Sequence, residues 1–452
     1  MASLFGTDGV RGLANRDLTA ELAVDLSVAA AHVLGDVGQF SHTSRPRPLA
    51  IVGRDTRASG EFLEHAVVAG LASAGVDVLM IGVVPTPGVA HLTASTGADL
   101  GVMLSASHNP MPDNGIKFFS AGGHKLADAL EAAIEQRLRE PWDRPLGEWV
   151  GRVHDGRYRV QEYLDHLIAA SPNPLTGVRV VVDCANGAAS DVAPNAYRRL
   201  GAEVIAIHST PDGYNINDGC GSTHMEDLQH AVVEHGAQLG IAHDGDADRC
   251  LAVAADGRII DGDQLLVILA LAMRDAGQLC HGTVVSTVMA NLGFSLAMAD
   301  VGIDVIATAV GDRYVLEEMR ANGYNLGGEQ SGHVVLTDYA TTGDGVLTAL
   351  LVMARMASTG AGLAELADVM TPLPQVLINV PEVDKHAVDS SAAVAAAVAA
   401  ETATLAGRGR VLLRKSGTEP LVRVMVEAPT IEQANESAER LVRVVRQELS
   451  LR

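Results

Sequence analysis

The sequence predicts an α/β protein with three repeated α/β domains of mainly parallel, mixed sheets, followed by a C-terminal α+β domain, around a central cleft. Short apolar runs alternate with longer helical patterns along most of the chain, which is typical of this fold class. One unit also recurs three times, at residues 74–81, 200–207 and 301–308. In each copy a helical pattern ends at a glycine and a buried strand follows. We place the domains at residues 1–155, 156–256, 257–371 and 372–452.

Each repeated unit contains two further predicted strands. One precedes the unit, at residues 49–52, 178–183 and 282–287, and the order strand, helix, strand at this spacing gives a parallel pair. The other follows it, at residues 100–104, 239–242 and 324–328, and ends in a polar loop. Ligands of open parallel sheets bind beyond the carboxyl ends of the strands. The three loops therefore predict one site built from three domains.

The last part of the chain departs from the repeat. Residues 371–374 predict a linker, residues 375–380 a strand and residues 392–400 an Ala-rich helix. Two strands at residues 410–414 and 421–427 flank a loop, and Thr430 begins a final amphipathic helix. The inward face of that helix is predicted to be Ala434, Ala438, Leu441, Val445 and Leu449. This pattern indicates an α+β module and not a fourth copy of the repeat.

Charge and composition limit the partners. The formal net charge of −22 repels nucleic acid and anionic membranes, so we expect neither as a partner. A phosphorylated ligand would need local Arg, Lys or a metal to reverse this field. The longest apolar run, residues 265–273, is shorter than the ~20 residues of a membrane helix. No signal-peptide pattern is visible and no cysteine pair has CxxC spacing. We expect a cytoplasmic protein.

Three aspartates, Asp244, Asp246 and Asp248, follow the apolar strand at residues 239–242. Alternate residues of an extended segment point the same way, so we expect the carboxylates to converge. Their mutual repulsion is relieved by a hard divalent cation with oxygen ligands. Three carboxylates leave positions for water or phosphate, which favours Mg²⁺ over Ca²⁺. A solvated acidic turn is the alternative, and we favour the metal because the loop follows an apolar strand.

The segment from Ser105 to Pro110 also follows a predicted strand. A serine there can act as a nucleophile if a metal or a neighbouring histidine activates it. By themselves these residues support a turn or a helix cap at Ser107 equally well. Just downstream, residues 113–118 predict a tight turn that returns Lys117 toward the loop, as an acid, a base or a phosphate ligand. A surface lysine is the alternative that this segment alone favours.

Two other segments predict contacts with a sugar and with a phosphate. In residues 329–333, Glu and Ser suit sugar hydroxyls, although an ordinary polar loop is supported equally well. In residues 414–420, a glycine lets a ligand come close to the backbone, and two hydroxyl groups can donate hydrogen bonds to it. Arg414 and Arg423 can each donate two parallel hydrogen bonds to phosphate oxygens. We favour a phosphate site over an ordinary basic hairpin, because a local cluster of positive charge is unusual in a chain with a net charge of −22 and is suited to an anion. Arg11, in a Gly-rich segment, is a weaker candidate for a phosphate contact.

Together these loops resemble those of the α-D-phosphohexomutase superfamily, along the full chain from Phe5 to the last helix. That family has three domains with a shared α/β core and a fourth α+β phosphate-binding domain. Residue by residue, the resemblance places the phosphoserine on Ser107, the metal loop on Asp244, Asp246, Asp248 and Arg249, the sugar loop on Glu329, Ser331 and His333, and the phosphate loop on Arg414, Ser416, Gly417, Thr418 and Arg423. Lys415 replaces a proline that is common in the family. Residues 5–12, 113–119 and 328–333 are most similar to the bacterial phosphoglucosamine mutases, of which Gln330 is typical.

The resemblance also implies a mechanism. One Mg²⁺ per chain would be held by the three aspartates and by a phosphoryl group on Ser107. That group would pass to O1 of glucosamine 6-phosphate and form a 1,6-bisphosphate. This intermediate would rotate by about half a turn and return its 6-phosphate to Ser107. The product, glucosamine 1-phosphate, is a precursor of UDP-N-acetylglucosamine and the cell wall. Lys117 and Arg249 would supply positive charge, and Lys117 or His108 would carry the hydroxyl proton. Glucose 1,6-bisphosphate or an equivalent is the implied activator. The oligomeric state stays open, with a homodimer as one option.

Other functions remain as alternatives. A phosphomannomutase or phosphoglucomutase differs only in the sugar loop, where Gln330 is a modest discriminator. In a phosphosugar phosphatase, water would hydrolyse the phosphoserine. Such an enzyme does not need a phosphate site that binds a bisphosphate in either orientation. A non-enzymatic sugar-phosphate sensor would be expected to lose Ser107 or an aspartate, and all are present.

Overall fold

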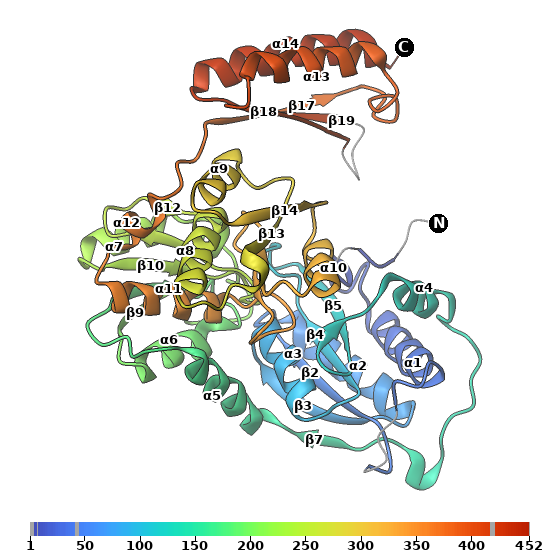
Figure 1. The fold of residues 1–452 in the computed structure, drawn as a ribbon. Helices are drawn as coiled ribbons and strands as arrows, with labels where there is room; N and C mark the ends of the chain where they lie inside the picture. Colours follow the sequence, from blue (N-terminus) through green and yellow to red (C-terminus); the bar gives the residue numbers. More distant parts are fainter. Residues whose placement is uncertain (1–3, 7, 41–44, 416–420, 452) are drawn as a thin grey trace. The chain divides into compact units, whose positions relative to one another are not determined.

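The computed structural model describes residues 4–6, 8–40, 45–415 and 421–451. The chain forms two compact units, one of residues 1–289 and 303–368 and the other of residues 290–302 and 369–452 (Figure 1). No helix in the described part of the chain is both long and apolar enough to cross a membrane.

The first sheet has the strand order β1-β5-β4-β2-β3-β7, with β6 paired to β5. Its strands are β1 (Val10–Leu13), β2 (Leu49–Arg54), β3 (Asp77–Val83), β4 (Leu100–Leu104), β5 (Asp113–Ser120), β6 (His124–Lys125) and β7 (Val153–Asp155). Its helices are α1 (Ala20–Asp36), α2 (Ser59–Ser73), α3 (Thr86–Ser95) and α4 (Asp128–Gln136). Strand β2 is parallel to β3 and β4, whereas β5 is antiparallel to β4 and β1. Leu26, Leu63, Val102 and Ile134 represent the core that the helices share with the sheet.

The second and third sheets repeat the central parallel arrangement. The second has the order β12-β11-β10-β8-β9 and the third β14-β13-β15-β16. The second comprises β8 (Arg179–Asp183), β9 (Glu203–Ile207), β10 (Leu239–Ala242), β11 (Leu251–Ala254) and β12 (Ile259–Ile260), with α5 (Val160–Ala170), α6 (Ala189–Arg199) and α7 (Glu226–Glu234). The third comprises β13 (Thr283–Thr287), β14 (Asp304–Thr308), β15 (Leu326–Gly328) and β16 (Val334–Leu336), with α8 (Gly262–Asp275), α10 (Asp312–Asn322), α11 (Gly345–Thr359) and α12 (Leu363–Ala367). Single 3-10 turns occur at Gly147–Trp149, Arg157–Arg159, Gly221–Thr223 and Cys280–Gly282.

The repeat seen in the sequence is a structural repeat. The predicted pairs are β2 with β3, β8 with β9 and β13 with β14, and all three are parallel. In each sheet the other neighbour of the first strand, β4, β10 or β15, is also parallel to it. The three polar loops therefore follow equivalent strands at the carboxyl ends of their sheets. The predicted class of mainly parallel mixed sheets is confirmed, and the domain boundaries remain a prediction.

The second unit is an α+β module, as expected. Its antiparallel sheet has the order β17-β19-β18. The elements are α9 (Leu292–Asp300), β17 (Gln375–Pro381), α13 (Ala392–Leu405), β18 (Arg410–Lys415), β19 (Leu421–Glu427) and α14 (Ile431–Leu449). Thr430 caps α14, because its hydroxyl accepts a hydrogen bond from the Gln433 N–H at 3.3 Å. The predicted inward face of α14 is buried against the sheet.

Candidate active site

Ser107 lies in the loop after β4, and its hydroxyl faces the carboxylates after β10. Its Oγ donates a hydrogen bond to Asp244 Oδ2 at 2.5 Å and lies 3.3 Å from His108 Nδ1. The backbone φ of Ser107 is 53°, a left-handed conformation that residues with a Cβ rarely adopt. Burial, then Arg249 and Arg11, lowers the pKa of His108 to about 4, so its ring is neutral near pH 7. The loop thus presents a buried hydroxyl beside a neutral imidazole and the carboxyl group of Asp244.

Asp244, Asp246 and Asp248 converge, with one oxygen from each lying within 4.8 Å of the others, and all three are buried. The loop does not run extended, as the sequence analysis expected. It turns at Ala247, whose φ is 54° and whose N–H donates to the Asp244 carbonyl at 3.1 Å. The carboxylates therefore meet because the loop turns, not because alternate residues of a strand share a face.

The three carboxylates have unequal environments. Burial, then Asp248 and Asp246, raises the pKa of Asp244 to about 8. Burial also acts against the charge of Asp248, but Lys117 and His333 outweigh it and hold the pKa of that carboxyl well below its usual range. Within the described part of the chain, Asp246 Oδ1 and Asp248 Oδ1 are buried and have no hydrogen-bond partner. Buried oxygens of this kind are suited to a hard cation.

Lys117 belongs to a strand and not to a turn. Residues 113–118, expected as a tight turn, belong to β5 (Asp113–Ser120). Gly115 makes this pairing possible, because a Cβ there would lie 2.4 Å from the Ser105 carbonyl oxygen. The strand carries the Lys117 side chain into the interior, where it is 3% exposed. The surface-lysine alternative is therefore wrong.

The ammonium group of Lys117 joins several acidic side chains. Its Nζ lies 2.7 Å from Asp246 Oδ2, 2.7 Å from Asp8 Oδ2 and 3.7 Å from Asp248 Oδ2. Burial alone would lower the pKa of Lys117, but Asp246 and Asp8 raise it well above its usual value. Arg11 adds positive charge here, because its Nη2 donates to Asp8 Oδ2 at 2.7 Å.

Arg249 lies at the end of the carboxylate loop. Its Nε is 4.0 Å from Asp244 Oδ2 and 4.0 Å from Asp248 Oδ1. That Nε is buried and makes no hydrogen bond to any described residue. The guanidinium group is therefore close enough to add positive charge beside Ser107 while keeping a donor for another anion.

The predicted sugar loop connects β15 to β16. Glu329 Oε1 accepts a hydrogen bond from the backbone N–H of Gly311 at 3.1 Å. The Ser331 hydroxyl oxygen is buried and has no hydrogen-bond partner among the described residues. His333 turns toward the carboxylates, with Nδ1 3.7 Å from Asp248 Oδ1 and Nε2 3.2 Å from Asp312 Oδ2. Burial would lower the pKa of His333, but Asp248 raises it to about 8. The structure thus brings this loop together with the carboxylate loop.

The predicted phosphate loop is described only in part. Ser416, Gly417 and Thr418 lie outside the described residues. Arg414 on β18 is paired in register with Arg423 on β19. Residues directly opposite each other point to the same face of a sheet, and like charges there repel. An anion bound between the two guanidinium groups would convert this repulsion into attraction.

Comparisons with known proteins identify the family. Models of the four phosphoglucomutase/phosphomannomutase domains match residues 2–143 (α/β/α domain I), 161–257 (domain II), 261–373 (domain III) and 377–444 (C-terminal domain). Phosphoglucosamine mutase from Streptomyces griseus is 65% identical over 454 residues, 99% of this chain and 100% of that one. The enzyme of the same name from Acidothermus cellulolyticus is 65% identical over 99% of this chain and 96% of that one. The chain belongs to the phosphoglucosamine mutase branch of the phosphohexomutases.

Solved structures share the fold of this phosphohexomutase. A phosphoglucomutase/phosphomannomutase family protein from Burkholderia thailandensis has a TM-score of 0.82 at 22% identity, covering 98% of this chain and 97% of that one. N-acetylphosphoglucosamine mutase from Aspergillus fumigatus, solved with GlcNAc-6P and magnesium, has a TM-score of 0.69 at 20% identity, covering 98% and 95%. A mutase is an isomerase, so the chain is an enzyme of that class. Phosphohexomutases depend on magnesium, and the Oδ1 atoms of Asp246 and Asp248, which accept no hydrogen bond from any described residue, suit such an ion.

One residue important to the phosphohexomutase site was missed by sequence reasoning. Arg57 is fully buried after β2, and its guanidinium donates hydrogen bonds to the carbonyls of Ser107 (3.0 Å), Asn109 (2.7 Å), Pro110 (2.6 Å) and Asp113 (3.0 Å). Its Nε is bound to Asp55 at 2.9 Å. The available signal was position, since residues 55–57 follow β2 at the same sheet edge as the Ser107 loop.

Two more overlooked residues connect the first sheet of the phosphohexomutase to the second. Asn217 Nδ2 donates to the Ser107 carbonyl at 2.8 Å and to the Asn109 carbonyl at 3.1 Å. Thr86 Oγ1 donates to Asp246 Oδ2 at 2.5 Å. The first bonds attach the serine loop to a segment of the second domain, and the last attaches the carboxylate loop to the start of α3. Such side-chain contacts between segments distant in sequence leave no periodic pattern.

Proposed function

We propose that the chain interconverts glucosamine 6-phosphate and glucosamine 1-phosphate through a phosphoryl group carried on Ser107. The observation that supports this most directly is the 2.5 Å hydrogen bond from Ser107 Oγ to the buried Asp244. A serine in this position can hold a phosphoryl group next to oxygen ligands for a cation. Relatives named phosphoglucosamine mutase, 60–65% identical over nearly the whole chain, support the substrate.

In the forward direction, O1 of glucosamine 6-phosphate attacks the phosphorus on Ser107. The bond from phosphorus to Ser107 Oγ breaks, and a bond from phosphorus to O1 forms. His108, whose Nδ1 lies 3.3 Å from the serine oxygen, receives the O1 proton. The 1,6-bisphosphate turns end for end, and Ser107 Oγ takes its 6-phosphoryl group. The sugar O6 recovers the proton, and glucosamine 1-phosphate leaves.

The positive groups around Ser107 suit this transfer. Phosphoryl transfer is catalysed mainly by positioning and by neutralising charge on the phosphoryl oxygens. Lys117 and Arg249 are held beside Ser107 by Asp244, Asp246 and Asp248. One Mg²⁺ per chain, held by the three aspartates and an oxygen of the Ser107 phosphoryl group, would add further positive charge there.

Substrate recognition is assigned to the remaining loops. Glu329 and Ser331 bind sugar hydroxyls, while His333 holds the sugar loop to Asp248. Residues 414–418 with Arg423, and Arg11, bind the phosphate that is not being transferred. We further propose that glucose 1,6-bisphosphate or an equivalent loads Ser107. The A. fumigatus N-acetylphosphoglucosamine mutase, solved as an S69A variant with that compound, supports this choice.

The setting of the reaction follows from its chemistry. The product would supply UDP-N-acetylglucosamine for cell-wall synthesis. We place the enzyme in the cytoplasm, because charged phosphosugars do not cross a bilayer unaided. A homodimer is also proposed, and the mass of the protein in solution tests it.

A coupled assay for glucosamine 1-phosphate tests the function. It contains glucosamine 6-phosphate, Mg²⁺ and a trace of glucose 1,6-bisphosphate, with mannose and glucose phosphates in parallel. We expect preference for the amino sugar, lost in Ser107→Ala and kept in Ser358→Ala, a change at an exposed serine of α11. Mass spectrometry should find the phosphoryl group on residue 107. Equal turnover of mannose or glucose phosphate would overturn the substrate, and activity in Ser107→Ala would overturn the mechanism.

A further inference from the structure

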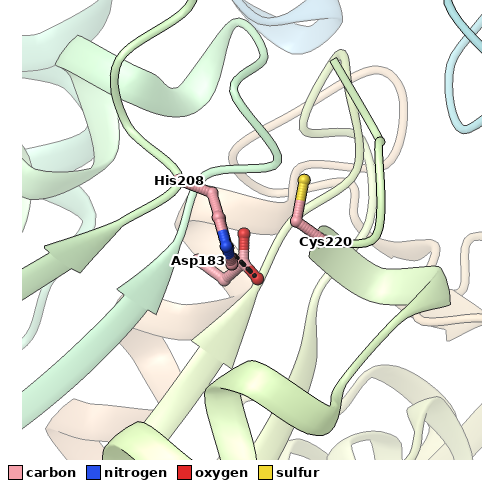
Figure 2. A group of neighbouring side chains, drawn as sticks. All are labelled: Asp183, His208 and Cys220. Carbon is pink, nitrogen blue, oxygen red and sulfur yellow. Dashed lines mark hydrogen bonds and ion pairs between the residues drawn. The ribbon is translucent and has the colours of Figure 1, made fainter. Parts of the chain in front are cut away.

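A second set of potential metal ligands lies in the second sheet and shares no residue with the carboxylate loop (Figure 2). Asp183 ends β8, His208 follows β9, and Cys220 precedes the turn at Gly221–Thr223. One ligand atom from each lies within 4.8 Å of the other two. Asp183 and Cys220 are fully buried and His208 is half-buried. Three chain segments thus supply an oxygen, a nitrogen and a sulfur donor to one cluster of side chains.

The donors differ in kind from those beside Ser107. An all-oxygen set suits Mg²⁺, whereas imidazole nitrogen and thiolate sulfur are the preferred ligands of Zn²⁺. Three protein ligands leave a fourth tetrahedral position for water. The two sets of ligands would therefore select different ions.

Both ring nitrogens of His208 face carboxylates. Its Nδ1 faces Asp183 Oδ2 at 3.0 Å, and its Nε2 lies 3.3 Å from Asp227 Oδ2. Metal-bound histidines commonly donate their other ring N–H to a carboxylate, which fixes the tautomer. Without an ion, Nδ1 of His208 forms a hydrogen bond with Asp183 Oδ2 at 3.0 Å, so a bound ion would take the place of that bond while Nε2–H donates to Asp227.

The backbone at His208 is also unusual. Its φ is 43°, the left-handed region that residues with a Cβ seldom occupy. Conformations of this kind cost free energy and concentrate at functional sites. Burial raises the pKa of the Cys220 thiol to about 12, so the thiol is neutral unless a cation is bound next to it.

We propose that Asp183, His208 and Cys220 bind a Zn²⁺-like thiophilic divalent cation. The thiol proton of Cys220 passes to solvent when the ion binds. His208 and Cys220 stand at the two ends of the segment 208–220, so the ion closes this loop. The loop contains Asn217, whose side chain holds the Ser107 carbonyl at 2.8 Å. The ion therefore stiffens the loop that supports the nucleophile, without contacting substrate.

Cobalt substitution in the full-length chain tests the proposal. Co²⁺ is added to chelator-treated protein that contains saturating Mg²⁺, and the thiolate-to-cobalt charge-transfer absorption is recorded. We expect the band at one equivalent in the wild type and in Cys184→Ser, and its loss in Cys220→Ser. Cys184→Ser is the matched control, because Cys184 is as buried as Cys220 and is next to Asp183 in the sequence. A wild type without the band, or a band that persists in Cys220→Ser, would overturn the proposal.

A second variant guards against misfolding of Cys220→Ser. His208→Asn removes the imidazole, and asparagine tolerates a left-handed backbone better than most residues. We expect its Zn²⁺ affinity, measured by calorimetry, to fall by at least about tenfold. Zn²⁺ should raise the thermal midpoint of the wild type and of Cys184→Ser but not of His208→Asn. Unchanged affinity in His208→Asn would contradict the assignment, whatever the mutase activity of the variant.

Discussion

The guanidinium of Arg57 donates a hydrogen bond to the carbonyl oxygen of Ser107 at 3.0 Å, from a side chain that is completely buried. The same group binds three more carbonyls along the serine loop. These bonds hold Ser107 in its left-handed conformation, which the residue would not adopt by itself. Arg57 is thus a positioning residue for the nucleophile.

Arg57→Lys should lower kcat by about 100-fold and leave KM for the sugar phosphate nearly unchanged. A lysine has one ammonium group and cannot reach four carbonyls at once, so the loop moves, and small displacements of a nucleophile have effects of this size. Steady-state kinetics measures both constants. The control is Arg54→Lys, a nearby arginine whose Nε lies 3.3 Å from Glu64. A kcat of wild-type size in Arg57→Lys would show that the loop keeps its shape without the guanidinium.

Asp248→Asn should weaken Mg²⁺ binding and lower kcat by at least about 100-fold, since a catalytic cation contributes several kcal/mol. Calorimetry with Mg²⁺ and the coupled assay at several Mg²⁺ concentrations measure the two effects. Asp256→Asn, in an exposed turn where Oδ1 accepts the Arg258 N–H, is the matched control. Chelation of the wild type should abolish activity, and Mg²⁺ should restore it. Full activity of Asp248→Asn without added Mg²⁺ would exclude this carboxylate as a metal ligand.

Lys117→Met should destabilise the fold by about 3–5 kcal/mol, because it removes the ammonium group that lies 2.7 Å from the buried carboxylate of Asp246 and also takes one of its cationic partners from Asp8. Urea denaturation in chelator measures the free energy of unfolding without help from a bound ion. Lys415→Met provides the comparison, since its ion pair with Asp389 is exposed and should contribute less than about 1 kcal/mol. Equal effects of the two substitutions would contradict the conclusion that Lys117 compensates buried carboxylates.

Ser331→Ala should raise KM for glucosamine 6-phosphate about three- to tenfold, the effect of losing one neutral hydrogen bond. The free energy of unfolding should stay the same or rise, because the substitution removes a buried hydroxyl that has no partner among the described residues. Kinetics and urea denaturation are compared with those of Ser358→Ala. A loss of stability with unchanged KM would place the hydroxyl in the structure and not in substrate binding.

Stability should fall in acid partly through His91, whose ring stacks on His166 at 4.1 Å and lies near Tyr163, the partner of Asp344. Burial, then His166, lowers the pKa of His91 to about 4. The unfolded chain, with a histidine pKa of about 6.5, takes up the proton first, so stability is lost as the pH falls from about 6.5 toward 4.

The effect is reduced by partial exposure of the ring. We expect the wild type to lose about 1 kcal/mol more than His91→Gln between about pH 7 and pH 5. Urea denaturation at the two pH values measures this difference, and the exposed His235→Gln should behave like the wild type. Parallel losses in the wild type and in His91→Gln would remove His91 as a source of acid sensitivity.

The sequence was informative where structure depends on local pattern. Strands that follow a glycine, such as β3 after Gly75 and β9 after Gly201, could be placed from the sequence. The glycine marks the end of a helix, and the apolar run after it marks a buried strand. The carboxylates after β10 could be found because their residue types imply a cation. The turn at Ala247 that brings them together could not, since alanine gives no signal for a left-handed backbone.

Other features depended on contacts between distant segments. Residues 113–118 carry the local signature of a turn, but pairing of residues 113–116 with β1 and of residues 116–120 with β4 makes them part of β5. Arg57 looks like a surface arginine until its carbonyl partners, 50 or more residues away, are known. Ser416, Gly417 and Thr418 lie outside the described residues, so the phosphate loop rests on sequence and on the pair Arg414 and Arg423.

Ser107 and Asp244 stand 137 residues apart in the chain. At about 5–20 residues per second, the ribosome makes the serine at least several seconds before the carboxylate that its hydroxyl contacts. Asn217, which fixes the serine carbonyl, is also made late. A growing or truncated chain therefore displays the serine without the surroundings that would let it exchange a phosphoryl group. On the proposed mechanism, phosphoryl transfer through Ser107 therefore needs at least the second sheet to have been made.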